Sequence, residues 1–212
     1  NVKGDDYETV MMQIKKEIAL LFKNHSYLLK NKVMTKQDQT LFQKYIDGQT
    51  NTVDVTRSLS YLSELLHRHF QKKVYILVDE YDAPINYAYT TFKDQPLGAL
   101  KRVLEFFSTL FGAAFKTNPH LSRGVITGIL RIAKGNIFSD LNNVREYTLL
   151  DNHFATSYGF TQAEVDTLLT QIPTKTPAEQ IKAWYNGYTF GGEVLYNPWS
   201  MMCCLSEQGR LA

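Results

Sequence analysis

Apolar residues recur at helical spacing through the first third of the chain. Between residues 7 and 22 they fall on one helix face, and a second such face runs from residue 55 to residue 70. Between them, Thr35 and Asp38 have the spacing of a capping box at the start of a short helix. The pattern therefore predicts three helices before the first strand.

A run of five apolar residues follows at 74–78, and it predicts a strand. Both faces of this strand are apolar, which is typical of a central parallel strand covered by helices on each side. The pattern predicts an irregular loop at residues 84–96 and a long helix at residues 100–111. It predicts two further strands, at residues 123–128 and 145–150. This alternation predicts an α/β core with a parallel sheet.

The composition changes after Asp151, where strand patterns give way to short helices. Thr161 marks the start of one helix and residues 176–187 predict another. Residues 188–196, with two glycines at their centre, predict a hairpin. We therefore predict two domains, an α/β core over residues 1–150 and a helical subdomain with a small hairpin over residues 151–212.

Composition limits the classes of function. The chain has 212 residues, of which 44% are apolar, and its net charge of +2 gives no basic field for direct nucleic-acid binding. No apolar run approaches the roughly 18 residues of a membrane span. The two cysteines, Cys203 and Cys204, are adjacent, which is typical of reduced packing residues and favours a cytoplasmic protein.

Three acids, Asp79, Glu80 and Asp82, directly follow the first strand. In open α/β sheets the ligand crevice lies beyond the carboxyl ends of the strands. An apolar strand that ends in Asp-Glu has the Walker B pattern of P-loop ATPases, in which the first acid holds Mg²⁺ and the second polarises the attacking water. An acidic surface turn is the simpler alternative for so short a pattern.

The second strand ends in two further candidates, Thr127 and Arg131. In many ATPases a neighbouring strand presents a polar residue to the γ-phosphate, and an arginine just beyond it neutralises the transferred charge. The alternative for Arg131 is an exposed cation at the start of a helix.

Four segments together closely resemble the bacterial AAA-ATPase-like family. They are "LSELLHRHFQKKVYILVDEYDAPI", "VITGILRIAKGNIFSDLNNVREYTLLD", "YGFTQAEVDTLL" and "WYNGYTFGGEVLYNPWS", and they run in the family's order from about Tyr61 to Ser200. The resemblance implies the distal part of a P-loop NTPase core, commonly followed by a PD-(D/E)XK nuclease-like domain. The "YNGY" and "YNPWS" segments look like family signatures, and we assign them no chemical role.

The resemblance also implies roles for the candidate residues. Asp79 and Glu80 become the Walker B pair, with Asp79 at the Mg²⁺ ion, and Asp82 becomes a characteristic acid counted with the cofactor-binding residues. Thr127 takes the sensor position and Arg131 lies near the γ-phosphate. The implied cofactors are ATP and Mg²⁺.

The sequence has no G-x-x-x-x-G-K-[ST] phosphate-binding loop. Together with a first residue that is Asn1, this favours a fragment that is inactive alone, from a parent ATPase that switches an attached, nuclease-like effector domain. One alternative is a catalytically silent interaction module on the same fold. Another is a DExD-type helicase, because residues 79–82 spell that box, although "ITG" in the next strand and the lack of a basic surface speak against it.

Overall fold

The computed structural model describes residues 6–30, 33–91, 98–129, 141 and 143–211. The chain divides into two compact units, Asn1–Val144 and Arg145–Ala212. This division falls a few residues before the boundary expected at residue 150.

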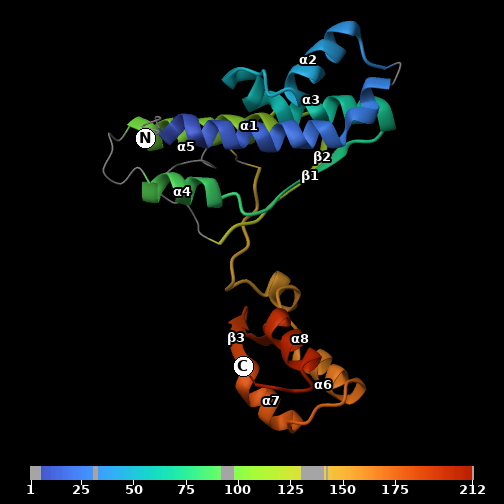
Figure 1. Ribbon diagram of the computed structural model, residues 1–212, viewed down its shortest axis with the longest axis vertical. Helices are drawn as coiled ribbons and strands as arrows, with labels where there is room; N and C mark the ends of the chain where they lie inside the picture. Colours follow the sequence, from blue (N-terminus) through green and yellow to red (C-terminus); the bar gives the residue numbers. More distant parts are fainter. Residues whose placement is uncertain (1–5, 31–32, 92–97, 130–140, 142, 212) are drawn as a thin grey trace. The chain divides into compact units, whose positions relative to one another are not determined.

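Helices make up most of the first unit (Figure 1). Before the first strand come α1 (Asp6–Asn24), the 3₁₀ turn η1 (Ser26–Lys30), α2 (Lys36–Ile46) and α3 (Thr52–Phe70). After it come α4 (Ala83–Thr91), α5 (Gly98–Phe111) and the π-helical turn η2 (Gly112–Lys116). The three early helices and the long helix over residues 100–111 are thus confirmed.

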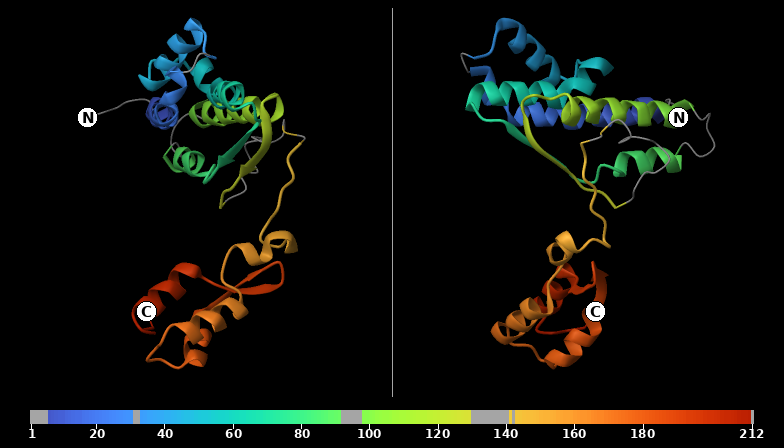
Figure 2. Two further views of the ribbon diagram at one scale, coloured as in Figure 1. Left: turned by 90° about the vertical axis from the view of Figure 1, so that its right-hand side faces the viewer. Right: turned by 180° about the vertical axis from the view of Figure 1, so that it is seen from behind.

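The sheet of this unit contains, among the described residues, two parallel strands, β1 (Val74–Val78) and β2 (Leu121–Ile126). Ile76 lies opposite Gly124, and Val78 opposite Ile126. The chain between the strands passes through α4, α5 and η2, a helical crossover of the kind that a parallel pair requires. Figure 2 shows the two strands running side by side beneath the helices. A mixed α/β fold with a parallel sheet is therefore confirmed.

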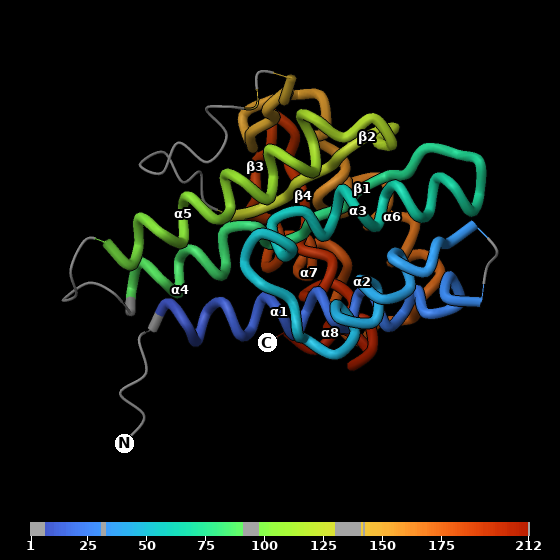
Figure 3. The backbone as a smooth tube through the Cα atoms, turned by 90° about the horizontal axis from the view of Figure 1, so that it is seen from above, coloured from blue at the N-terminus to red at the C-terminus, as the bar shows by residue number. Residues whose placement is uncertain are grey.

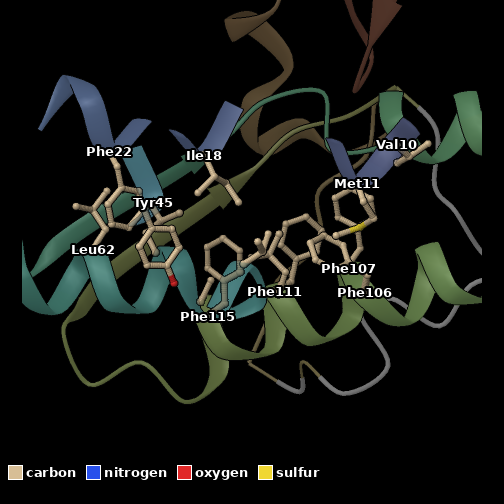
Figure 4. Close-up of a cluster of buried hydrophobic side chains, with 14 of the residues drawn as sticks. Val10, Met11, Ile18, Phe22, Tyr45, Leu62, Phe106, Phe107, Phe111 and Phe115 are labelled. Atoms are coloured by element: carbon tan, nitrogen blue, oxygen red, sulfur yellow. The ribbon is translucent and has the colours of Figure 1, made fainter. Parts of the chain in front are cut away.

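The core lies between the helices and one face of the sheet. Helices α1, α3 and α5 pack against one another, and Figure 3 shows them side by side. Figure 4 shows the buried aromatic side chains that fill this space, from Phe22 and Tyr45 at one end to Phe107 on α5. The rings of Phe22 and Tyr45 stack with centroids 4.1 Å apart. Ile76 of β1 joins the same cluster, so the sheet is anchored to the helices through this face.

The opposite face of the sheet is exposed. Tyr75 and Leu77 of β1 are 65% and 74% exposed, and Val125 of β2 is 49% exposed. Successive strand residues point to opposite faces, so these three side chains share the face that α1, α3 and α5 do not cover. The prediction that helices cover both faces of β1 is therefore wrong for the described residues. We call these three residues the open face.

The segment predicted as an irregular loop at residues 84–96 begins as a helix, α4. Pro84 lies in its first turn, where the missing N–H costs no hydrogen bond. Ile85 and Ala88, three positions apart, are 2% and 0% exposed, so the helix buries one face. The prediction failed because Pro84 and the two tyrosines, Tyr87 and Tyr89, made this short apolar spacing hard to recognise in the sequence.

No strand forms at residues 145–150, so the third predicted strand is wrong. The chain turns here instead, because the backbone N–H and the hydroxyl of Thr148 donate to Asp151 Oδ2 at 2.6 and 2.8 Å. The N–H of Asp151 donates back to the carbonyl of Thr148 at 3.0 Å. Such local side-chain hydrogen bonds compete with strand pairing, and Leu150 is left 88% exposed.

Asp38 joins α2 to α3. Its Oδ2 accepts from the backbone N–H and hydroxyl of Thr35, each at 2.9 Å, in the capping box expected at the start of α2. The same oxygen accepts from Arg68 of α3 at 2.9 Å. Burial alone would raise the pKa of Asp38, but the Thr35 hydrogen bonds and the Arg68 guanidinium outweigh it and lower that pKa.

Asp38→Asn should lower the free energy of unfolding by about 1–3 kcal/mol at pH 7, because a charged acceptor with several donors is lost. A carboxyl whose pKa is lower in the folded state stabilises the fold above its unfolded pKa of about 3.9 and loses that contribution as the pH falls through the folded pKa. The gap between wild type and variant should therefore close below about pH 4. Urea unfolding of both proteins at a series of pH values measures this difference in the free energy of unfolding.

The matched control is Asp47→Asn, at an exposed acid just after α2. A change there should stay within about 0.5 kcal/mol. Equal losses in both variants, or an Asp38→Asn gap that is the same at pH 7 and pH 3, would contradict the role given to Asp38.

The second unit combines short helices with a hairpin. Its elements are η3 (Asn152–Ser157), α6 (Gln162–Gln171), α7 (Ala178–Tyr185), β3 (Asn186–Phe190), β4 (Glu193–Tyr196) and α8 (Pro198–Ser206). Thr161 caps α6 in a capping box with Glu164, and β3 pairs with β4 antiparallel. Both helices and the hairpin predicted here are confirmed. The small core is formed by Val165, Ile181, Tyr196, Met201 and Cys204.

Candidate functional site

The parallel register brings the ends of β1 and β2 together. Because Val78 lies opposite Ile126, the next residues, Asp79 and Thr127, leave the sheet at the same edge. The N–H of Thr127 donates to the carbonyl of Val78 at 2.8 Å, and the N–H of Tyr81 donates to the carbonyl of Thr127 at 3.1 Å. The pairing therefore continues past both strands into the loops that carry the candidate residues.

Asp79 and Thr127 are in direct contact through their side chains. The Thr127 hydroxyl donates a hydrogen bond to Asp79 Oδ1. The same oxygen accepts from the backbone N–H of Glu80 at 3.0 Å. Both side chains belong to exposed residues, so a carboxyl group and a hydroxyl are presented together to solvent at the strand ends.

Glu80 has a left-handed backbone with φ of 50°. Such a conformation in a residue other than glycine costs about 1–3 kcal/mol and persists only where the surroundings impose it. Its carbonyl accepts from the N–H of Ala83 at 3.0 Å, which closes a tight turn into α4. The turn leaves Glu80 exposed beside Asp79.

Asp82 differs from the other two acids because it is 3% exposed. Its Oδ1 accepts from the N–H of Ile129 at 3.3 Å, and its Oδ2 accepts from the side-chain amide of Asn86 at 3.1 Å. The sequence pattern grouped Asp82 with Asp79 and Glu80, but the structure places its carboxyl group inside the protein. The partner Asn86 was missed, although a spacing of four residues in a helix is a readable signal.

Arg131 lies outside the described residues, so its role stays a prediction. Among the described residues, the structure contains no group of three or more His, Cys, Asp or Glu side chains that could enclose a metal ion. Asp79 with the neighbouring Thr127 still fits Mg²⁺, which prefers hard oxygen ligands, needs only one or two carboxylates and keeps several waters. The strand ends therefore suit a nucleotide-bound Mg²⁺ better than a metal held by protein groups alone.

Two other features of the described residues lie apart from the strand ends. A shallow hollow lies on α2 between Lys36, Thr40 and Lys44, but none of the candidate residues lines it and we assign it no role. No helix in the described ranges is long and apolar enough to cross a membrane.

Sequence comparison supplies independent information about the same segment. A family described as predicted AAA-ATPases matches residues 4–138, which is more than half of the chain and includes all the candidate residues. A protein from Azotobacter chroococcum mcd 1, named as an uncharacterized protein in the vnfD 5′ region, is 29% identical over 137 residues. That match covers 65% of this chain and 25% of the relative, so the chain spans about a quarter of that protein's length. No solved structure matches the chain.

Proposed function

This chain belongs to the AAA-ATPase-like family of predicted ATPases, and we propose that it carries the hydrolysis half of an active site that uses ATP and Mg²⁺. The observation that supports this most strongly is the contact between Asp79 and Thr127 at the ends of two parallel strands. A ligand crevice is expected at this edge of an α/β sheet. A surface turn gives no reason for the second strand to place a hydroxyl against the first acid.

Each candidate residue other than Asp82 has a role in the proposed site. Asp79 would hold the Mg²⁺ ion of bound Mg-ATP, directly or through water, and the ion would supply positive charge to the phosphate oxygens. Glu80 would orient the attacking water and accept its proton. Thr127 would donate its hydroxyl toward the γ-phosphate, and Arg131 would stabilise charge that develops there.

A phosphate-binding loop must come from another segment, because the 212 residues contain no G-x-x-x-x-G-K-[ST]. Backbone N–H groups and a lysine of such a loop hold the phosphates in P-loop proteins. We propose that this loop and a nuclease-like effector domain belong to the same, longer protein of a bacterial cytoplasm. Hydrolysis would then switch the effector.

A catalytically silent interaction module is the second candidate. The open face of Tyr75, Leu77 and Val125 supports it, because exposed apolar surface on a sheet is typical of an interaction site. The two candidates differ in whether nucleotide is turned over.

Removal of Mg²⁺ separates these candidates in a protein that joins this chain to its phosphate-binding loop. We expect ATP hydrolysis with Mg²⁺ and a fall of about 10²-fold or more when EDTA removes it, because the ion stabilises charge on the transferred phosphoryl group. Phosphate release at fixed ATP measures the rate. Absence of hydrolysis with Mg²⁺ present would favour the silent module, and hydrolysis unaffected by EDTA would contradict the metal site.

A further inference from the structure

Two segments beyond the strand ends are hydrogen-bonded to each other. They are residues 81–82 after β1 and residues 127–129 after β2. The N–H of Tyr81 donates to the carbonyl of Thr127 at 3.1 Å. In the opposite direction, the N–H of Ile129 donates to Asp82 Oδ1 at 3.3 Å. The first of these hydrogen bonds ends on Thr127 and the second begins two residues after it, and the hydroxyl of Thr127 donates to Asp79.

Asp82 also lies directly before α4 and is hydrogen-bonded to Asn86 of that helix. Its backbone carbonyl accepts from the N–H of Asn86 at 2.8 Å, while its Oδ2 accepts from the side-chain amide of the same residue at 3.1 Å. The side-chain bond from Asn86 orients the carboxyl group, and the backbone bond ties Asp82 to the start of the helix. Asp82 therefore links three elements: the end of β1, the start of α4 and the loop that follows β2.

The loop after β2 lies very close to this carboxyl group. A Cβ atom added at Gly128 would be 2.5 Å from the ring of Tyr81 and 2.7 Å from Asp82 Oδ1. Real Cβ contacts are longer, so only glycine allows the backbone to approach this far. A sequence that places glycine between Thr127 and Ile129 thus permits the hydrogen bond from Ile129 to Asp82.

We infer that Asp82 is a positioning residue, which holds the loop after β2 so that Thr127 stays beside Asp79. The inference rests on the proposed function, because Thr127 and Asp79 act on the nucleotide only if the site hydrolyses ATP. It gives Asp82 a different task from the cofactor contact expected from sequence. The carboxyl group is buried and accepts from the N–H of Ile129 and from the amide of Asn86, whereas Asp79 and Glu80 are exposed.

Substitutions at position 82 separate positioning from direct contact with the cofactor. Asp82→Ala removes both acceptors. Asp82→Asn keeps one oxygen for the N–H of Ile129, and the amide of Asn86 can turn to accept from the new amide. Holding the N–H of Ile129 and the amide of Asn86 needs these acceptors but not the charge, whereas a contact with Mg²⁺ needs the charge. Rescue by asparagine is therefore expected only if Asp82 acts through the loop.

Amide hydrogen exchange on the 212-residue chain tests the hydrogen bond between Ile129 and Asp82 without any need for ATP turnover. Exchange at Ile129 should be about tenfold faster in Asp82→Ala, the change that follows from loss of one hydrogen bond, and close to wild type in Asp82→Asn. Asp47→Ala, at an exposed acid after α2, is the control and should leave this exchange unchanged. An unaltered rate at Ile129 in Asp82→Ala would overturn the inference whatever the chain's function.

Steady-state kinetics in a protein that joins the chain to its phosphate-binding loop test the consequence. Asp82→Ala should lower kcat by about 10²-fold, as expected when reacting groups are displaced by about 1 Å, with KM for ATP within about twofold. Asp82→Asn should retain most of the rate, and it carries the test alone if Asp82→Ala does not fold.

Equal kinetic losses in Asp82→Asn and Asp82→Ala would assign the charge a direct role and overturn the positioning inference. So would faster exchange at Ile129 without any change in kcat. If the wild-type protein does not hydrolyse ATP, the proposed function fails, and the exchange experiment still decides whether Asp82 fastens the loop.

Discussion

Glu80→Gln should lower ATP turnover by about 10²–10⁴-fold, the range that general-base assistance typically contributes, in a protein that joins this chain to its phosphate-binding loop. The amide of glutamine is far too weak a base to take a proton from water. Glutamine keeps the shape of the side chain, and at φ of 50° it has the same backbone cost as glutamate. The loss should therefore fall on chemistry, with nucleotide affinity and melting temperature unchanged.

Phosphate release, measured beside nucleotide affinity by calorimetry, distinguishes chemistry from binding. The matched control is Glu105→Gln on α5, where an exposed glutamate forms an ion pair with Lys101 at 3.6 Å. This variant should turn over ATP at the wild-type rate. If Glu80→Gln does so too, Glu80 is only a surface acid in a tight turn.

Asp79→Asn should act on the metal instead. Its amide oxygen can still accept from the Thr127 hydroxyl and from the N–H of Glu80, as Oδ1 does now, so the loops should keep their structure. The negative charge is lost, and we expect the apparent affinity for Mg²⁺ to fall by about 10²-fold, the upper end of the losses measured when groups around a bound metal are changed. Nucleotide binding in the presence of Mg²⁺ should weaken with it.

Titration of the ATPase rate with Mg²⁺ at saturating ATP measures this shift, and high Mg²⁺ should restore part of the rate. Asp47→Asn, a change at an exposed acid far along the sequence from the strand ends, should leave the titration where it is in wild type. An unshifted titration in Asp79→Asn would mean that this acid serves only to hold Thr127.

Local patterns in the sequence predicted α1, α2, α3 and α5 of the first unit, but not the short helix α4. The spacing from residue 7 to residue 22 and the Thr35 capping box each reflect interactions within one helix, so both can be read without knowledge of the rest of the fold. The coverage of β1 could not be read in this way. An apolar residue such as Leu77 looks the same in the sequence whether a helix covers it or, as here, 74% of it is exposed.

The sequence identified which residues form the candidate site, but it predicted their arrangement in space only in part. The places of Asp79 and Thr127 after two strands indicated that they would lie close together, because parallel strands end at one edge. The separation of Asp82 from its neighbours was hidden, since one short acidic run holds two exposed side chains and one buried one. Its burial depends on Gly128 and Ile129, which are more than forty positions away along the chain.

The open face also has a consequence for association between molecules in concentrated solution. Tyr75, Leu77 and Val125 form an apolar surface on a sheet that, within the described ranges, pairs only β1 with β2. Unpaired strand edges beside apolar side chains favour the addition of strands from other molecules. A net charge of +2 over 212 residues provides little electrostatic repulsion between molecules to oppose this. The open face therefore gives the chain a route to association that does not require the helical core to unfold.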